Sequence, residues 1–228
     1  MISIRKCPIC EGLKFKHFIE AEDYSNTKEM FNIVSCETCD FTITSPRPKD
    51  SGLAKYYVSE NYISHTNKKN GLFNFLYQTI RKYAIKNKLS ILNSMVKETN
   101  HLDIGCGTGE FLHACKEAGF KTKGIEPSSI AREQAIKNYD LDVTENTDLS
   151  MFSNNLFSSI SMWHVLEHIP KLEETVKNLK QILSNEGIVI VAVPNKDSWD
   201  AKYYGKFWAA WDVPIHLWHF SQKSIKFF

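Results

Sequence analysis

The stretch Leu102-Asp-Ile-Gly-Cys-Gly-Thr-Gly-Glu-Phe111 joins a short apolar segment to a helical one through three closely spaced glycines. Residues 101–104 are predicted to form a buried strand. Residues 110–118 are predicted to form a helix, because Phe111 and Cys115 recur at helical spacing. Glycine permits a tight turn and the close approach of a ligand. A strand, a Gly-x-Gly-x-Gly turn and a helix in this order predict a pocket for a nucleoside-bearing cofactor.

Two classes of cofactor use such a turn, and position 110 separates them. A dinucleotide site requires Gly-x-Gly-x-x-Gly, whose third glycine would fall where this chain has Glu110. A carboxylate beside a phosphate costs about 1 kcal/mol at 4 Å in water, and about 4 kcal/mol at an effective dielectric constant near 20. Asp103 would also repel a pyrophosphate, whereas it could accept a hydrogen bond from an ammonium group. These residues favour a cofactor with a cationic centre and disfavour a nicotinamide oxidoreductase.

From Asn100 to Ser221 the chain resembles the class I S-adenosylmethionine-dependent methyltransferases, with the glycine turn as motif I. The resemblance implies an α/β fold with a doubly wound, mostly parallel, Rossmann-like sheet of strand order 3-2-1-4-5. The strands after the first are expected over residues 121–125 and 141–144, within 160–168, and over 187–194. The segment Trp211–Ser221 resembles a signature of the branch that methylates small metabolites, including sugar-type and lipid-linked acceptors.

The resemblance also implies which residues bind S-adenosylmethionine. Glu126 is expected to hold both ribose hydroxyls, although a carboxylate at that place could instead cap a helix N-terminus. Asp148 is expected to meet the adenine amino group, although a solvated loop acid is the plain alternative. Trp163 is expected to flank the cofactor. The expected cofactor-binding residues are Asp103, Gly105, Cys106, Gly107, Gly109, Glu126, Pro127, Asp148, Leu149 and Trp163.

Catalysis of methyl transfer requires an aligned acceptor and, where the acceptor carries a proton, a general base. Four histidines are candidate bases, since the unperturbed pKa of imidazole lies near neutrality: His164, His168, His216 and His219. His164 ranks first, because the fourth strand is expected to open there toward the methyl group, and His216 ranks second. Glu167 is expected to orient a neighbour or to cap a helix. A hydrogen-bonded structural role is the alternative for each histidine.

Cys7-Pro-Ile-Cys10 and Cys36-Glu-Thr-Cys39 form two Cys-x-x-Cys pairs. Four thiolates in this arrangement predict a structural zinc ribbon, with Cys7, Cys10, Cys36 and Cys39 as ligands and no open position for a water. Two disulfides or redox pairs are the alternative, which a reducing cytosol disfavours. Cys106 and Cys115 are expected to be small buried side chains rather than nucleophiles.

The predicted organisation is a zinc ribbon over residues 1–45, a connector with a long helix over 46–99, and a methyltransferase domain over 100–228. The chain stops where the family usually adds a helix and an antiparallel strand pair, so that pair is expected to be missing and the fifth strand to form a sheet edge. Two aromatic groups are expected near the acceptor or in the core. They are Tyr56, Tyr57, Tyr62 and His65 in the connector, and Trp199, Tyr203, Trp208 and Trp211 near the end.

Composition limits the partners. With 228 residues, 43% hydrophobic and 24% charged, the chain can bury one sizeable core. A formal net charge of +2 without a basic stripe argues against a nucleic-acid partner.

No apolar run is long enough to span a bilayer, and no signal core is visible, so a cytoplasmic location is expected. The sequence predicts a methyltransferase for a small-molecule substrate; a non-catalytic binding protein is the alternative.

Overall fold

The computed structural model describes residues 1–57 and 72–227. Tyr62 and His65 therefore lie outside the described residues. The chain divides into two compact units that interleave in sequence. The first unit comprises residues 1–67, 166–173 and 193–228, and the second comprises residues 68–165 and 174–192. Within the described residues, no helix is both long and apolar enough to cross a bilayer.

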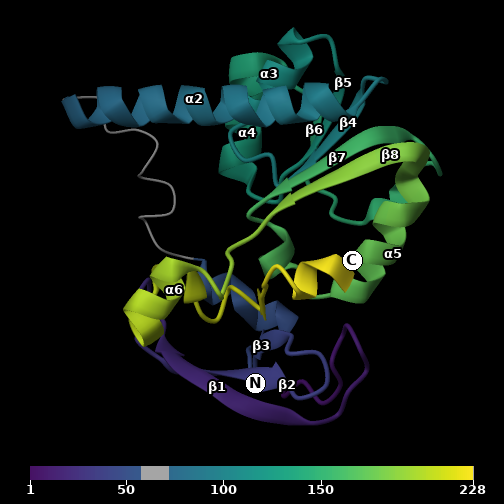
Figure 1. Cartoon of the computed structure of the whole chain (residues 1–228). Coiled ribbons are helices and arrows are strands. Elements are labelled where there is room, and N and C mark those ends of the chain that lie inside the picture. The colour runs from purple at the N-terminus through teal and green to yellow at the C-terminus, as the bar shows by residue number, and fades with distance from the viewer. Residues whose placement is uncertain (58–71, 228) are drawn as a thin grey trace. The chain divides into compact units, whose positions relative to one another are not determined.

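The second unit is built on a five-stranded parallel sheet (Figure 1). Its strands are β4 (Asn100–Ile104), β5 (Lys121–Ile125), β6 (Val143–Thr144), β7 (Phe157–Trp163) and β8 (Leu183–Ala192). Their spatial order is β6-β5-β4-β7-β8. Counted along the chain, this is the order 3-2-1-4-5, and the predicted doubly wound α/β fold is confirmed.

The helices of this sheet are α2 (Leu72–Met95), α3 (Glu110–Glu117), α4 (Ser129–Tyr139) and α5 (Leu172–Ile182). Helix α2 lies against α3 (Figure 1), where Leu92 packs with Phe111, Cys115 and Phe120. Cys106 is buried on the other side of α3 beside Leu112 and other apolar residues. Burial raises the pKa of both the Cys106 and the Cys115 thiols. Both cysteines are therefore buried packing residues, as expected from the sequence.

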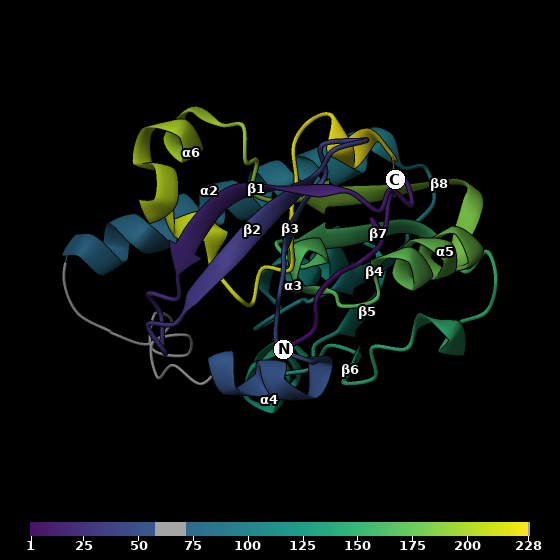
Figure 2. The same ribbon diagram turned by 90° about the horizontal axis from the view of Figure 1, so that it is seen from below.

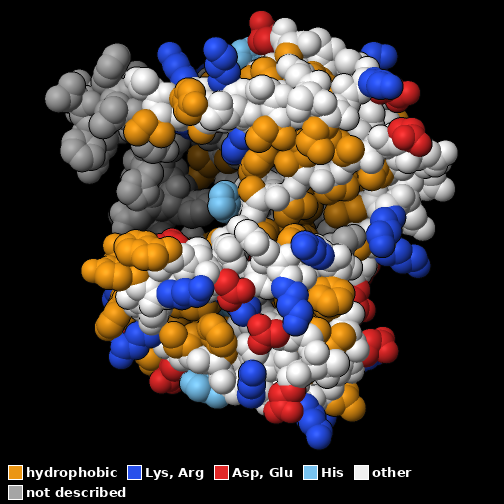
Figure 3. Space-filling view, in the orientation of Figure 1, with side chains coloured by type: hydrophobic (Ala, Val, Ile, Leu, Met, Phe, Trp, Pro, Cys, Tyr) orange, Lys and Arg blue, Asp and Glu red, His pale blue; other side chains and the backbone are white. Residues whose placement is uncertain are grey.

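Strand β8 lies at one end of the described sheet. The side chains of β7 are almost all buried, whereas those of β8 are half-buried or exposed. Hydrophobic side chains accordingly reach the surface over β8 (Figure 3).

The first unit contains a four-stranded antiparallel sheet in the order β1-β2-β3-β9. Its strands are β1 (Phe15–Glu22), β2 (Met30–Cys36), β3 (Thr42–Thr44) and β9 (Trp218–His219). Strands β1 and β2 form a long, twisted hairpin (Figure 2). Since β9 comes from the far end of the chain, the ribbon strands and the C-terminal segment share one sheet.

The core of this unit joins the hairpin to residues that follow the second unit's last strand. Phe31 and Ile33 of β2 pack with Trp208, Trp211 and further buried apolar residues. Helix α6 (Trp199–Tyr204) carries the other aromatic residues of the predicted patch, and these are exposed. Hydrophobic side chains gather on the surface over α6 (Figure 3). The predicted aromatic patch is thus split between core and surface.

Candidate functional site

The glycine turn after β4 is held open by three left-handed backbone conformations, with φ of +72° at Gly105, +56° at Gly107 and +85° at Gly109. A Cβ atom at Gly105 would overlap Val165, and one at Gly109 would lie 2.7 Å from a methyl carbon of Leu141. A Cβ atom at Gly107 would meet no atom within 4 Å. Packing therefore requires glycine at two of these positions, while the middle one borders open space.

Glu126 follows β5, and its carboxylate turns back to the glycine turn. Its Oε2 accepts a hydrogen bond of 2.9 Å from the backbone N–H of Gly107, and its Oε1 accepts one of 2.8 Å from Ser128. The N-cap of α4 is Ser128 rather than Glu126, because the Ser128 hydroxyl accepts from the N–H of Ala131. Pro127 lies exposed between the two. The structure thus brings Glu126 together with motif I.

Asp103 on β4 belongs to a buried polar chain that the sequence did not reveal. Its carboxylate accepts a hydrogen bond of 2.5 Å from the Ser161 hydroxyl, and Ser161 in turn lies 3.1 Å from Nε2 of His101. The Nδ1 atom of His101 lies 2.8 Å from the hydroxyl of Ser159. Burial raises the pKa of Asp103 to about 7. Alternate residues of β4 and β7 form this chain, because His101 is opposite Ser159 and Asp103 is opposite Ser161 in the parallel register.

The expected adenine segment follows β6. Asp148 is exposed, and its Oδ1 accepts a hydrogen bond of 2.9 Å from the N–H of Ser150. Asp148 therefore caps a short 3-10 helix that begins at Leu149, whose side chain is buried. This geometry is that of a capped loop.

Trp163 ends β7, and its indole packs edge-on against Phe111 with ring centroids 5.5 Å apart. The Nζ atom of Lys88 lies 4.3 Å from the centre of the Trp163 ring, a cation–π distance. Burial lowers the pKa of Lys88. The indole Nε1 is buried and has no hydrogen-bond partner among the described residues. Lys88 was not expected from the sequence, and its helical spacing alone carries no signal of this contact.

His164 follows Trp163 and is exposed, with a left-handed φ of +60°. Its N–H donates a hydrogen bond of 2.9 Å to the carbonyl oxygen of Ala192 at the end of β8. The ring therefore lies at the carboxyl end of the parallel strands, the edge at which doubly wound sheets bind their ligands.

The other candidate bases lie in the first unit. Glu167, His168 and His216 offer polar atoms within 4.8 Å of one another, and this group is called the histidine cluster below. The rings of His168 and His216 meet edge to face with centroids 4.6 Å apart. Burial, and then the charge of His216, lower the pKa of His168 to about 4. His219 is different, since it is buried and its Nε2 lies 2.9 Å from the hydroxyl of Thr44.

The two cysteine loops have matching backbone geometry. In the first loop, the N–H of Glu11 donates to the carbonyl of Cys7 at 2.9 Å, and Glu11 has a φ of +61°. In the second loop, Asp40 donates to Cys36 at 2.9 Å with a φ of +63°. Each loop therefore turns its two thiols toward the same point.

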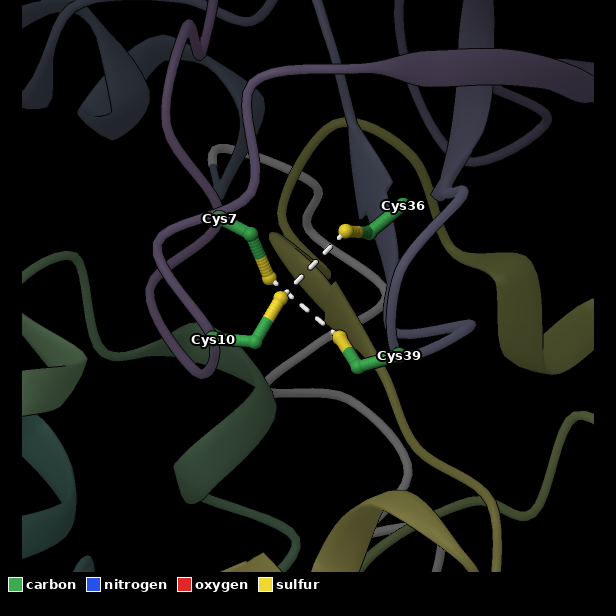
Figure 4. A group of neighbouring side chains, drawn as sticks. All are labelled: Cys7, Cys10, Cys36 and Cys39. Atoms are coloured by element: carbon green, nitrogen blue, oxygen red, sulfur yellow. Dashed lines mark hydrogen bonds between the residues drawn. The ribbon is translucent and has the colours of Figure 1, made fainter.

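The four thiols converge (Figure 4). The Sγ atoms of Cys7 and Cys39 are 3.5 Å apart, and so are those of Cys10 and Cys36. Four sulfurs at about 2.3 Å from a central zinc would be about 3.8 Å apart, so this donor set fits a tetrahedral ion with little movement. Gly12 leaves room for the sulfurs, because a Cβ atom there would lie 3.1 Å from the Cys36 Sγ.

The fold and the glycine turn define a Rossmann-like methyltransferase domain. The profile of a family described as "Methyltransferase domain" matches residues 65–226, and the chain belongs to this family. The predicted methyltransferase family is thereby confirmed.

Relatives agree with this assignment. A ubiquinone biosynthesis O-methyltransferase from Haemophilus ducreyi is 29% identical over 106 residues, which cover 42% of this chain and 45% of that protein. Its counterpart from Rickettsia canadensis is 25% identical over 138 residues, which cover 56% of this chain and 57% of that protein. The chain thus spans about half the length of the curated relatives it matches.

Solved structures show the same fold. A SAM-dependent methyltransferase from Archaeoglobus fulgidus superposes with a TM-score of 0.55 at 19% identity, covering 69% of this chain and 72% of the other. A SAM-dependent methyltransferase from Thermotoga maritima, titled a possible histamine N-methyltransferase, gives 0.51 at 22% identity, covering 67% and 74%. At these identities the likeness establishes the fold alone.

Proposed function

We propose that the chain binds S-adenosylmethionine in its second unit and transfers the methyl group to a small-molecule acceptor. The observation that carries this proposal is the open space beside Gly107, next to the Glu126 carboxylate, within a methyltransferase-family domain. An empty position at a glycine that packing does not require is the kind of cradle that a ligand fills.

Each part of the cofactor has a proposed partner in this unit. Glu126 accepts hydrogen bonds from the ribose hydroxyls, and the backbone of Gly105, Cys106, Gly107 and Gly109 forms the floor of the pocket. Pro127 borders the ribose, and Asp148 and Leu149 border the adenine. Asp103 and Trp163 lie toward the sulfonium end. When bound, S-adenosylmethionine supplies a methyl carbon that a nucleophile attacks as the carbon–sulfur bond breaks.

His164 is the proposed general base, because it is exposed at the carboxyl end of β7 in the unit that holds the cofactor residues. It would take the proton from the acceptor as the acceptor attacks the methyl carbon. His216 is the second candidate, and Glu167 would orient a neighbouring group. His164→Gln should lower kcat by about 100-fold or more, the usual contribution of a placed base, while leaving cofactor affinity within twofold.

The acceptor is proposed to be a sugar-type or lipid-linked metabolite. Two relatives are named as O-methyltransferases of ubiquinone biosynthesis, which favours a small molecule over a macromolecule. A cytoplasmic location and a structural zinc ion at the four cysteines belong to the same proposal.

In the structure, an ion pair makes Glu110 a weaker reason to exclude a dinucleotide cofactor. Glu110 forms an ion pair of 2.7 Å with Arg81, and both side chains are about one-quarter exposed. This pairing offsets the negative charge that was expected to repel a phosphate. The family match therefore favours the methyltransferase more strongly than the charge at position 110 does.

Isothermal titration of the purified chain with S-adenosylmethionine and with its demethylated product tests cofactor binding. Methyl transfer is then measured with a methyl-labelled cofactor and a panel of hydroxylated sugars and lipid-linked phenols. Binding in the micromolar range with labelled product is the expected result. Binding without transfer to any acceptor would favour the non-catalytic alternative, and a folded chain that binds neither compound would overturn the proposal.

A further inference from the structure

We propose that Glu167, His168 and His216, the histidine cluster of the first unit, bind a divalent first-row transition metal ion. This site is separate from the four cysteines. It is compatible with His164 as the base of the proposed methyl transfer, and it excludes His216 as the alternative base, because both ring nitrogens of His216 would then be occupied.

The three donors are held close together by the backbone that carries them. Glu167 and His168 lie in a short 3-10 helix, Leu166–His168. The N–H of Leu217 donates a hydrogen bond of 2.8 Å to the carbonyl oxygen of Glu167. The indole of Trp218 donates one of 2.7 Å to the carbonyl oxygen of Ile169. These two hydrogen bonds hold the segment around Glu167 and His168 against the segment that follows His216. The donor side chains are therefore positioned before any ion binds.

Hydrogen bonds on the far side of each ring set the tautomers. The Nδ1 atom of His168 lies 3.1 Å from the carbonyl oxygen of Ile215, and Nδ1 of His216 lies 2.9 Å from that of Ala210. A carbonyl oxygen can only accept, so each Nδ1 carries a proton, and a ring without a second proton has its lone pair on Nε2. Metal-binding histidines are oriented in this way, with the remaining N–H given to a backbone carbonyl.

Acceptor atoms accumulate on the inner side of the cluster. The Nε2 atom of His216 lies 3.9 Å from Oδ2 of Asp212, and the buried carboxylate of Glu167 belongs to the same group of atoms. Lone pairs and carboxylates so close together repel one another unless a proton or a metal ion lies among them. A metal ion bound by Glu167, His168 and His216 would relieve this repulsion.

The donor set selects the kind of ion. Two imidazole nitrogens with a carboxylate suit Zn²⁺, Co²⁺, Ni²⁺, Fe²⁺ or Mn²⁺, whereas Ca²⁺ and Mg²⁺ prefer sites built from oxygen atoms alone. Bonds of about 2.0 to 2.1 Å to zinc would require ligand atoms roughly 3.4 Å apart. One polar atom of each residue lies within 4.8 Å of the others, so metal binding requires the three side chains to move closer together.

Co²⁺ is a suitable probe, because it reports its ligands. The full chain, purified with zinc at its cysteines, is exposed to Co²⁺, freed of unbound ion, and analysed for metal content and visible absorption. We expect one zinc and one cobalt ion per chain, with weak ligand-field bands and no sulfur-to-cobalt charge-transfer band. A strong charge-transfer band would mean that cobalt has replaced zinc at the cysteines. If cobalt binds only there, or does not bind at all, the proposal is overturned.

Variants locate the ion. The double variant His168→Ala/His216→Ala should bind Co²⁺ at least 10-fold more weakly and should lose the rise in Tm that Co²⁺ produces in the parent chain. His17→Ala is the matched control, because His17 is exposed on β1, and it should bind Co²⁺ like the parent.

A further variant, Glu167→Gln, distinguishes loss of a metal ligand from misfolding of the double variant. Glu167→Gln keeps the size of the side chain and removes one charged ligand, so it should weaken Co²⁺ binding while the Tm measured without cobalt stays near that of the parent. Unchanged Co²⁺ affinity in both variants would overturn the proposal. Titration of the same proteins with S-adenosylmethionine reports separately on the proposed function, since the cofactor residues lie in the other unit.

Discussion

The Glu126 carboxylate and the backbone N–H of Gly107 are joined by a hydrogen bond of 2.9 Å. It links the residue that follows β5 to the middle of the turn that follows β4, and these two strands are neighbours in the parallel sheet. The bond holds a negative charge at the edge of the open space beside Gly107. Two hydroxyl groups of a ribose would find an oriented acceptor there.

Glu126→Gln should weaken S-adenosylmethionine binding by about 10- to 100-fold, since hydrogen bonds to a charged group contribute about 1.5 to 3 kcal/mol. Glutamine keeps one acceptor oxygen for the backbone, so the fold should survive. Titration calorimetry measures the affinity, and Glu133→Gln, an exposed acid on α4, serves as the control. An affinity within twofold of the parent would contradict a ribose-binding role for Glu126.

Gly107→Ala and Gly109→Ala should separate binding from stability. Alanine at Gly107 must adopt a left-handed conformation, which costs about 1 to 2 kcal/mol, but its methyl group enters open space. Alanine at Gly109 bears the same cost and also overlaps Leu141 and Ala135.

We therefore expect Gly107→Ala to fold with a modest loss of stability and to lose cofactor binding, while Gly109→Ala loses more stability than Gly107→Ala. Urea unfolding combined with cofactor titration compares the two. Full cofactor affinity in a folded Gly107→Ala chain would show that the open space is not the binding pocket.

Asp103→Asn should change how stability depends on pH. Burial raises the pKa of Asp103 to about 7 in the folded state, against about 3.9 in an unfolded chain. Between about pH 4 and pH 7 the folded state binds the extra proton, so the contribution of Asp103 to the free energy of unfolding falls as the pH rises. The variant lacks this slope and should gain stability relative to the parent above pH 7.

Urea unfolding at several pH values between about 4 and 8.5 checks this prediction. Asp142→Asn is the control, because Asp142 is exposed. Parallel pH profiles for the parent and Asp103→Asn would show that the buried carboxyl group does not titrate in this range.

Loss of the proposed zinc ion should disorder the first unit selectively. Cys36→Ser weakens a metal site whose binding energy is typically about 10 kcal/mol or more. Hydrogen exchange should then quicken in β1, β2 and β3 and also in β9, since β9 pairs with β3. The strands β4 to β8 should keep their protection. Cys115→Ala is the control, because Cys115 is not one of the four converging cysteines, and this variant should retain zinc. Equally fast exchange in both units of the Cys36→Ser chain would argue against this selectivity.

Local patterns were sufficient to predict structural features that consist of residues close together in the chain. The glycine turn between β4 and α3 was predicted because its residues are consecutive, and the four cysteines converge from two short loops. The strand order 3-2-1-4-5 came from the resemblance to a family and is confirmed by the sheet. The roles of the individual site residues, His164 and Glu126 among them, stay predictions.

Pairing between distant segments was decided only by the tertiary structure. Nothing in the two residues of β9 indicates a partner, since so short a strand has no periodicity, yet Trp218 pairs with Ile43. The bond between Ser161 and Asp103 depends on the register of two parallel strands.

The approach of His168 to His216 has the same origin, because it requires two stretches of chain to meet in the first unit. The sequence by itself determined the glycine turn and the cysteine loops, because these consist of residues close together along the chain, and its family resemblance gave the class of fold. The histidine cluster and the shared ribbon sheet were decided by long-range packing, which local spacing does not encode.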